Sequence, residues 1–495
     1  MNTMDRSNKF LIEGEDVRSA PSPAARPQHS DYVSRKKIYP KLARGTFRNV
    51  KWAVMAITLA IYYIVPWIRW DRGEALPDQA ILFDFANQRL LFGPIEIWAQ
   101  EFYYVTGLLV LGALGLFLVT SIAGRMWCGY ACPQTVWTDL MIAVERFWQG
   151  DRNGQLRLDA QPWTFEKIWK KSVTHLSWLA IALATGGALV FYFRDAPTLA
   201  AELVHGTAPT VAYVFLGLFT LTTYVLGGLA REQVCIYMCP WPRIQGAMVD
   251  RDSLLISYRK LRGEPRAAHK KGTSWEGRGD CIDCKACVSV CPMGIDIRDG
   301  SQLECIQCAL CIDACNEIMD RVGRPRDLIA YTTEGNLANA TSAPREGWRI
   351  IRPRTMLYTA MITIVASLMG WSLLHRADFE LSVIQDRNPL FVVLSDGGLR
   401  NGYTIKIANK VEGPRTFKLR FSGPAGLQPK FVEFDGTDPT IEVGPSEVRA
   451  VKVFLLLPGA KKKDLKSDAE PVTIELQDVA SDRTASRSTT FRSPS

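Results

Sequence analysis

Cysteine is absent from the first 127 residues of this 495-residue chain and from everything after residue 315. All twelve cysteines lie in one central stretch, in closely spaced groups that indicate metal ligation or redox chemistry rather than disulfides. The chain also lacks a G-x-G-x-x-G motif after a predicted strand, which argues against a built-in nicotinamide or flavin site of the Rossmann type. Any electrons that the chain handles must then come from an external donor.

The first thirty residues lack an apolar run and contain Pro21, Pro23 and Pro27. We therefore expect residues 1–31 to form a disordered tail, with no signal peptide before the first apolar segment. The formal net charge is +9 at pH 7. Because basic residues gather beside apolar segments, this excess is better explained by membrane flanks than by nucleic-acid binding.

Five apolar runs are each about as long as a helix that crosses a bilayer of roughly 30 Å hydrocarbon thickness. The first run is slightly short and contains Pro66. One such run could be a buried core helix, but five of them predict a membrane protein. The predicted spans are residues 52–68, 103–122, 173–193, 211–230 and 353–375.

Basic residues are distributed unevenly between the segments that connect these spans. Seven lie between residue 35 and the first span and more lie in the loop 123–172, whereas the loops 69–102 and 194–210 are poorer in them. The positive-inside rule then places the N-terminus, the loop 123–172 and the segment 231–355 in the cytoplasm. With five spans, the C-terminal domain at 376–495 would be periplasmic, in a bacterial cytoplasmic (inner) membrane.

The most specific motif is CIDCKACVSVCP at 281–292, which has the spacing C-x2-C-x2-C-x3-C-P. The spacing recurs in CIQCALCIDACN at 305–316, with Asn316 in place of the proline. The two runs resemble bacterial ferredoxins with two [4Fe–4S] clusters, in which the fourth cysteine of each run ligates the other cluster. The resemblance implies one cluster held by Cys281, Cys284, Cys287 and Cys315, and another held by Cys305, Cys308, Cys311 and Cys291.

Two other interpretations of these runs stay open. Structural zinc sites also use the spacing C-x2-C, although zinc does not need a run of four cysteines twice over. The clusters could also have a purely structural role. We assign residues 251–352 to this ferredoxin-like domain and its linker.

A second cysteine motif, C-x3-C-P, occurs at 128–133 and again at 235–240. The copies are 107 residues apart, and the preceding apolar runs end at Ala123 and Ala230, which are separated by the same distance. Residues 32–250 thus form a four-span membrane domain with a parallel internal repeat, each half ending in a cysteine pair at the cytoplasmic surface. We infer that pseudo-two-fold packing brings the pairs together, and that the proline ends a helix at each second cysteine.

The thiols of this motif are candidates for redox chemistry and copper binding: Cys128, Cys132, Cys235 and Cys239. Thiolate and thioether ligands favour Cu(I), so Met126 and Met238, beside the pairs, are weaker candidates. His175, at the cytoplasmic start of the third span, is another weak candidate, although a histidine there is more often an interface residue. The alternative for the cysteines is that they are small buried side chains that pack helix ends.

The order of these features is distinctive: a basic N-terminus, paired spans ending in C-x3-C-P, a two-cluster segment, a fifth span and an exported β domain. From about residue 32 onward the chain resembles the CcoG/FixG/RdxA family, accessory proteins of cbb3-type cytochrome c oxidase assembly. The stretch RNPLFVVLSDGGLRNGYTIKIANK at 387–410 resembles the start of that family's exported immunoglobulin-like domain. Alternating stretches fit such a β-sandwich at residues 402–408, 416–421, 447–457 and 471–476.

This resemblance implies a membrane-bound cupric reductase that supplies Cu(I) to the oxidase, with copper as substrate and with oxidase subunits or copper-handling proteins as partners. Membrane polyferredoxins of the NapH/NosR type share both cysteine motifs, so a quinol-oxidising conduit is a second interpretation. Residues 95–104, IEIWAQEFYY, could border a quinone pocket, although an interfacial aromatic belt is the simpler explanation. A non-catalytic platform for oxidase assembly is the third.

Overall fold

The computed structural model describes residues 37–73, 76–269, 272, 274–338, 349–411, 413–434, 436, 439–465 and 467–494. The predicted disordered tail at 1–31 lies outside these ranges. Within them, five helices are long and apolar enough to cross a membrane, which confirms the predicted membrane architecture. They are α1 (Thr46–Ile64), α2 (Tyr103–Ala123), α6 (Phe165–Val190), α8 (Thr210–Thr223) with its π-helical continuation to Ala230, and α14 (Pro353–Leu374).

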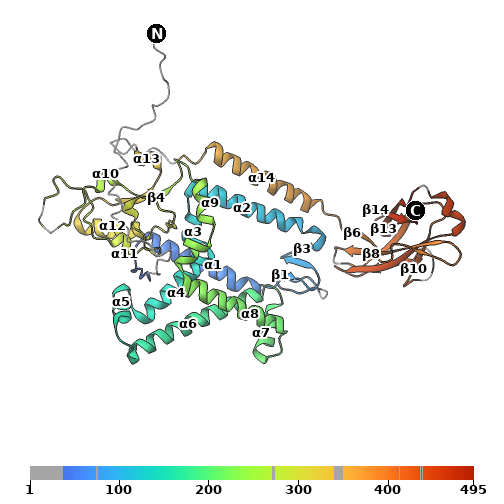
Figure 1. Ribbon diagram of the computed structural model, residues 1–495, viewed down its shortest axis with the longest axis horizontal. Helices are drawn as coiled ribbons and strands as arrows, with labels where there is room; N and C mark the ends of the chain where they lie inside the picture. The colour runs from blue at the N-terminus through green and yellow to red at the C-terminus, as the bar shows by residue number, and fades with distance from the viewer. Residues whose placement is uncertain are drawn as a thin grey trace, which may run out of the picture.

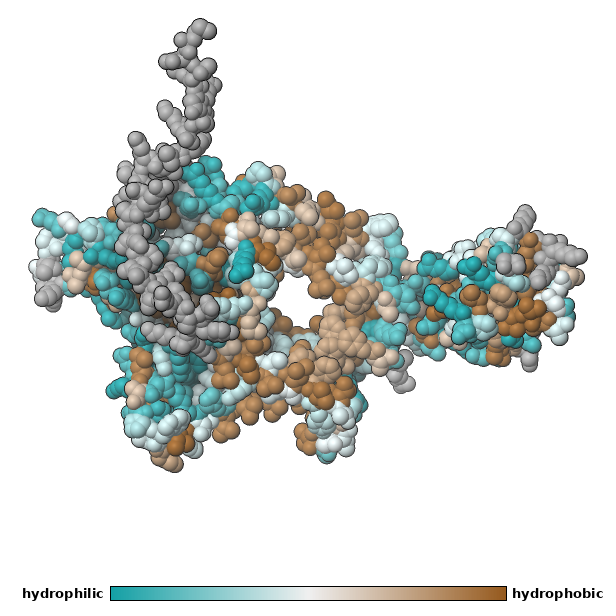
Figure 2. All heavy atoms as spheres, viewed as in Figure 1, coloured by the Kyte–Doolittle hydropathy of each residue, from teal (hydrophilic) through white to brown (hydrophobic). Residues whose placement is uncertain are grey.

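The membrane helices form two groups. α2 packs against α14, while α6 packs against α8 with α1 beside α6. Glycine permits the close contact between α6 and α8, because a Cβ at Gly186 would lie 3.0 Å from the carbonyl oxygen of Leu216. Figure 2 shows an opening with an apolar rim between the two groups. The groups are therefore joined near the ends of the helices rather than along their length.

Two spans begin earlier than the hydropathy pattern predicts, because their first turns carry charges. α6 begins at Phe165 rather than at 173, and α1 begins at Thr46 rather than at 52. Arg48 and Lys51 of α1 are buried, with their charged groups 2.9 and 3.8 Å from one carboxylate oxygen of Asp139 on α4 (Pro133–Gln149). These two cations, which we counted among the basic residues that flank the first span, lie inside the protein, since an acid on another helix compensates their charge.

The two halves of the repeat end their spans in the same way. α2 ends at Gly124 (φ 58°, ψ −128°), and α8, continued by π-helical turns at Tyr224–Ala230, ends at Arg231 (φ 47°, ψ −114°). Arg231 is held in this backbone region, which is unfavourable for a side chain, by an ion pair with Glu145 of 2.7 Å. The chain therefore breaks before each C-x3-C-P motif, and the motif does not continue the membrane helix.

After each break, the chain leaves the spans of its own half of the repeat and packs against the spans of the other half. The first motif forms the short helix α3 (Met126–Tyr130), and the second forms a π-helical turn at Val234–Met238. Cys132 and Cys239 have extended backbone before the proline, as predicted. The following helix α4 packs on α6 and the end of α8, while α9 (Trp241–Met248) packs on α2. This exchange brings the two motifs to the same place.

The ferredoxin-like part lies at one end of the membrane helices and the β-sandwich at the other (Figure 1). The elements of the ferredoxin-like part are β4 (Leu255–Tyr258), α10 (Lys260–Gly263), α11 (Ala286–Ser289), α12 (Leu310–Val322), β5 (Ile329–Thr332) and α13 (Glu334–Ala338). Asp313 of α12 caps α1, accepting hydrogen bonds from the backbone N–H groups of Phe47 at 3.3 Å and Arg48 at 2.8 Å. The cluster-bearing segment is thus fixed directly to the first membrane helix.

The connections between spans contain structure that the hydropathy pattern did not predict. A three-stranded antiparallel sheet lies between α1 and α2, at the end of the helices near the β-sandwich (Figure 1). Its strands are β1 (Ile81–Asp84), β2 (Arg89–Phe92) and β3 (Ile95–Trp98). The other connecting helices are α5 (Arg152–Ala160) and α7 (Ala196–His205).

The C-terminal domain is a β-sandwich, as predicted. One sheet has the order β10-β12-β8-β6 with β7 paired to β8, and the other has the order β11-β9-β13-β14. Tyr403, Phe417 and Phe491 are fully buried between them. The strands are β6 (Phe379–Gln385), β7 (Val392–Val393), β8 (Leu399–Asn409), β9 (Arg415–Ser422), β10 (Gln428–Phe431), β11 (Thr440–Val443), β12 (Val448–Leu457), β13 (Ala469–Asp478) and β14 (Thr484–Arg492).

A buried ionic cluster joins this sandwich to the membrane domain. Glu101, just before α2, accepts hydrogen bonds from Arg376 at 2.8 Å and from Lys410 at 2.6 Å. Lys410 also donates to Glu380 at 2.9 Å. Glu101 and Lys410 are 4% and 5% exposed, so neither charge is compensated by water.

Replacing Glu101 with glutamine should loosen this junction. The substitution leaves Lys410 buried with one acid fewer, at a cost of about 3 kcal/mol. We expect faster proteolysis of the linker 375–378, measured in detergent, with unchanged iron content. Glu166→Gln is the matched control, because the exposed pair of Glu166 with Lys170 contributes little. Equal proteolysis of the two variants would contradict the assigned junction.

Candidate iron–sulfur and thiol site

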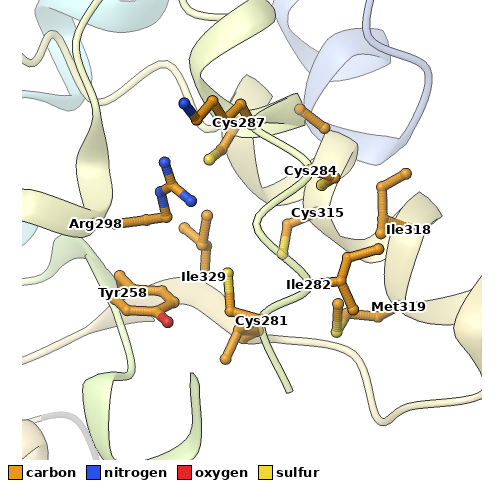
Figure 3. A pocket seen from close by; sticks show the side chains of 13 residues that line it. Tyr258, Cys281, Ile282, Cys284, Cys287, Arg298, Cys315, Ile318, Met319 and Ile329 are labelled. Carbon is orange, nitrogen blue, oxygen red and sulfur yellow. The ribbon is translucent and has the colours of Figure 1, made fainter. Parts of the chain in front are cut away.

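The first cysteine quartet lines one cavity. Cys281, Cys284 and Cys287 come from the first run, and Cys315 comes from α12 in the second run (Figure 3). The remaining walls are mainly apolar, formed by residues such as Ile318 and Ile329. The structure therefore brings together the four thiols that the ferredoxin resemblance grouped across the two runs.

The second quartet is assembled in the same crossed manner. Burial raises the pKa of Cys311 well above its ordinary value, and the neighbouring thiols Cys308, Cys305 and Cys291 add to the shift. Burial likewise raises the pKa of Cys291 to about 12, with Cys308 as the largest neighbouring contribution. Cys291, the last cysteine of the first run, thus lies among the thiols of the second run.

Left-handed residues shape each run around its thiols. Asp283 and Lys285 flank Cys284 with φ of 53° and 54°, and Gln307 and Ala309 flank Cys308 with φ of 56° and 61°. Alternating backbone handedness turns successive N–H groups inward, a geometry typical of anion and iron–sulfur sites. The two runs therefore fold alike because their spacing is alike.

These residues fit [4Fe–4S] clusters. Four thiols and apolar walls surround the first cavity, and burial raises the pKa of Cys287 to about 11 and that of Cys315 to about 12. Such thiols are neutral unless a metal displaces the proton, so cluster binding and proton release are coupled there. When bound, the clusters would supply one-electron transfer.

The four thiols of the C-x3-C-P motifs lie close to one another. Burial raises the pKa of Cys235 to about 12, and Cys132, Cys128 and Cys239 all contribute to the shift. Cys128 and Cys235 also pack against a buried cluster that contains Ile306 and Cys308. Among the described residues, no three His, Cys, Asp or Glu side chains are arranged as a single-ion site. Their mutual electrostatic influence supports the proximity inferred from the repeat, while copper binding by these thiols stays a prediction.

The first motif, residues 128–133, lies directly against the loop that carries Cys305 and Cys308. We call this segment the loop of the second quartet. A Cβ at Gly129 would lie 2.7 Å from the carbonyl oxygen of Ile306 and 3.0 Å from the backbone of Cys308. Only glycine therefore allows this contact. Similarly, a Cβ at Gly124 would lie 2.6 Å from the side-chain oxygen of Gln307.

Buried polar groups connect the same parts. The Cys128 thiol donates to Gln245 Oε1 at 3.3 Å, and Arg125 Nε donates to the same oxygen at 3.2 Å. Arg125 also donates to the carbonyl oxygen of Leu303, and its backbone N–H donates to Gln307 Oε1 at 2.8 Å. The sequence analysis did not indicate Gln245 or Gln307 as partners of this motif.

The three weaker candidate ligands, Met126, Met238 and His175, have different surroundings. Met126 is half-buried and Met238 is 63% exposed beside Cys239. His175 Nδ1 is hydrogen-bonded to the Tyr224 hydroxyl at 2.9 Å, and its ring packs edge-on against Trp178. These contacts favour the interface role of His175 over the ligand role.

Fold and site define a membrane-anchored iron–sulfur protein with a ferredoxin-type segment and a separate β-sandwich. Three family models match it: a 4Fe–4S binding domain at 105–149, a 4Fe–4S dicluster domain at 230–334, and the immunoglobulin-like fold at the C-terminal of FixG at 369–494. The chain also has three close curated relatives, and it belongs to the FixG/RdxA family, as the sequence resemblance predicted. This family membership makes it a membrane-associated 4Fe–4S oxidoreductase.

The relatives match over most of their length. "Nitrogen fixation protein FixG" of Rhizobium meliloti is 52% identical over 466 residues, covering 88% of this chain and 89% of the relative. "Protein RdxB" of Cereibacter sphaeroides is 48% identical over 464 residues, covering 93% and 97%. "Protein RdxA" of the same organism is 50% identical over 430 residues, covering 86% and 90%.

The crossed grouping of thiols can be tested by substitution with serine. If Cys315 belongs with Cys284, the two single variants should lose the same EPR signal and retain the other one. Cys291→Ser and Cys305→Ser should show the complementary loss. If Cys315→Ser instead resembled Cys305→Ser, each cluster would be held by a single run, contrary to the geometry.

The contact at Gly129 gives a second prediction. Gly129→Ala should perturb the second cluster and spare the first, because the added methyl group meets the backbone of Ile306 and Cys308. The measurement is anaerobic EPR with iron analysis. Gly112→Ala in α2 is the control, since a Cβ there has no neighbour within 4 Å. Identical spectra of the two variants would show that the loop is not in contact with the motif.

Proposed function

We propose that this protein is a membrane cupric reductase, which passes single electrons from its iron–sulfur segment to Cu(II) held at the four C-x3-C-P thiols. The observation that carries the proposal is the contact between the first motif and the loop of the second quartet. A backbone approach of this kind, with no side chain between Gly129 and Ile306, suits electron transfer to the thiols. Copper is the substrate here, and the clusters are the resident redox groups.

The chemistry of the thiols suits the product of this reaction. Burial raises the pKa of Cys128 and Cys235, so each thiol is neutral before a metal displaces its proton. Soft sulfur ligands favour Cu(I), and capture of the product therefore draws the reduction forward. Arg125 lowers the pKa of Cys128 against the effect of burial, which helps to stabilise the thiolate that copper requires.

Sidedness and partners belong to the same proposal. The ferredoxin-like part and the thiols would face the cytoplasm, and the β-sandwich would lie in the periplasm, in keeping with the basic loops. Cu(I) would then be passed toward assembly of a cbb3-type oxidase, through oxidase subunits or copper-handling proteins. The electron donor is external.

Substitution of all four motif cysteines with serine tests the role of the thiols. We expect unchanged iron content, loss of Cu(I) binding in anaerobic competition with a chelator, and a large fall in the rate of Cu(II) reduction. The variant Gly112→Ala in α2 serves as the control, because it keeps both motifs and an added Cβ there has no neighbour within 4 Å. Unchanged copper binding and rate would remove these cysteines from the mechanism. A fall in iron content would show that they hold iron instead of copper.

A further inference from the structure

We infer that the two C-x3-C-P motifs have different roles: the first is the fixed side that faces the electron source, and the second is the accessible side where copper is exchanged with a carrier through Cys239 and Met238. This inference rests on the proposed function and deepens it. The motifs have the same spacing in the sequence, so only their surroundings distinguish them.

The first motif is enclosed on the side of the second quartet. Gly129 and Tyr130 are both buried, and Tyr130 is 9% exposed. Thr135 donates a hydrogen bond to the carbonyl oxygen of Cys128 at 2.5 Å, which fixes the backbone of the motif to α4. These contacts leave little freedom for the first pair to open toward another protein.

Buried hydrogen bonds also hold the Cys128 side chain. Its thiol and the Arg125 guanidinium share Gln245 Oε1, and Gln245 is fully buried. Gln245 Nε2 in turn donates to Thr120 Oγ1 at 3.2 Å. Since Arg125 also donates to Leu303, the Cys128 side chain is connected to the loop of the second quartet through the buried side chains of Gln245 and Arg125. This is the arrangement expected of a group that receives electrons.

The second motif is exposed at positions where the first motif is buried. Tyr237, which corresponds to Tyr130 in the repeat, is 80% exposed rather than 9%. No residue of the turn Val234–Met238 is buried. Cys239 is exposed, whereas its counterpart Cys132 is partly buried. The contrast covers residues 129–132 against 236–239, whereas Cys128 and Cys235 are both partly buried.

Exposed sulfur on adjacent residues indicates the ligand that this side accepts. Met238 is 63% exposed next to Cys239, so a thioether and a thiol reach the surface together. Such a pair suits soft Cu(I) and a carrier that presents its own thiolates. Cys235, the first cysteine of the same motif, lines a second cavity together with Ile306, which lies next to Cys305 of the second quartet.

The proposed cycle uses two external reactants, the electron donor and a carrier that presents thiolates. One electron from a reduced [4Fe–4S] centre converts Cu(II) to Cu(I), and the thiol protons displaced by copper go to solvent. Departure of Cu(I) is then a ligand exchange without a redox change, in which carrier thiolates replace Cys239 and the motif thiols regain protons. The chain is ready for the next ion once its cysteines are free and the external donor has replaced the electron.

Alkylation rates test the asymmetry without copper. The full-length protein in detergent is treated anaerobically with a hydrophilic maleimide, and each cysteine is quantified by mass spectrometry. We expect Cys239 to react at least about tenfold faster than Cys132 and Cys128, because access limits thiol reactivity. Equal rates would overturn the inference.

The matched variants Cys132→Ser and Cys239→Ser test the roles themselves. In Cys239→Ser, single-turnover Cu(II) reduction by the dithionite-reduced protein should persist, while transfer of Cu(I) to a dithiol chelator slows by about tenfold or more. In Cys132→Ser, reduction itself should slow. If the wild-type protein reduces Cu(II) but both substitutions slow both steps equally, the inference is overturned and the proposed function stands. A wild-type protein that does not reduce Cu(II) would overturn the proposed function as well.

Discussion

The buried guanidinium of Arg125 connects the three parts of this protein on which the site depends. It stands at the end of α2, contacts Gln245 of α9 and donates to Leu303 in the loop of the second quartet. A buried cation is stable only when its hydrogen bonds are met, so each partner is held in place by the others. The membrane helices, the exchanged helix of the repeat and the cluster loop are thus fixed relative to one another.

The two halves of the repeat differ in the residues that surround their cysteine motifs. Gly124 and Arg231 end their spans with similar backbone angles, which shows the common plan of the two halves. The side chains differ, however, and each difference has a consequence. Glycine at 124 and 129 lets the first motif approach the cluster loop, whereas Arg231 and Ile236 occupy the corresponding positions of the second. Symmetric spacing therefore produces two unlike surroundings for the thiols.

Much of this arrangement could be predicted from the sequence because its physical signals are local or periodic. The resemblance to two-cluster ferredoxins implied both quartets, hydropathy predicted five spans, and the offset of 107 residues led us to infer that the motif thiols meet. Buried charges were not predictable in this way, since the partner of Arg48 lies on another helix at Asp139. The asymmetry of the motifs was also hidden, because it depends on contacts with Ile306 and Gln245 rather than on the motif itself.

The strength of the alternating pattern also decides which β-strands were predicted from the sequence. The four strands recognised from alternation, β8, β9, β12 and β13, are long strands whose inward residues are buried. The strands β10 and β11 are short, and β14 is largely polar, so they show weak alternation. The sheet β1–β3 was missed for the same reason, although it lies close to the ionic cluster around Glu101 that joins the sandwich to the membrane helices.

Rapid mixing of the dithionite-reduced, full-length protein with possible oxidants tests the central claim most directly. Cluster absorbance is followed anaerobically after addition of Cu(II) in one experiment and of a short-chain quinone in another. A cupric reductase predicts fast reoxidation by Cu(II), with one Cu(I) formed for each electron lost, and slow reoxidation by the quinone. Fast reoxidation by the quinone, with Cu(II) inert, would contradict the account and identify the protein as a quinone-linked electron conduit.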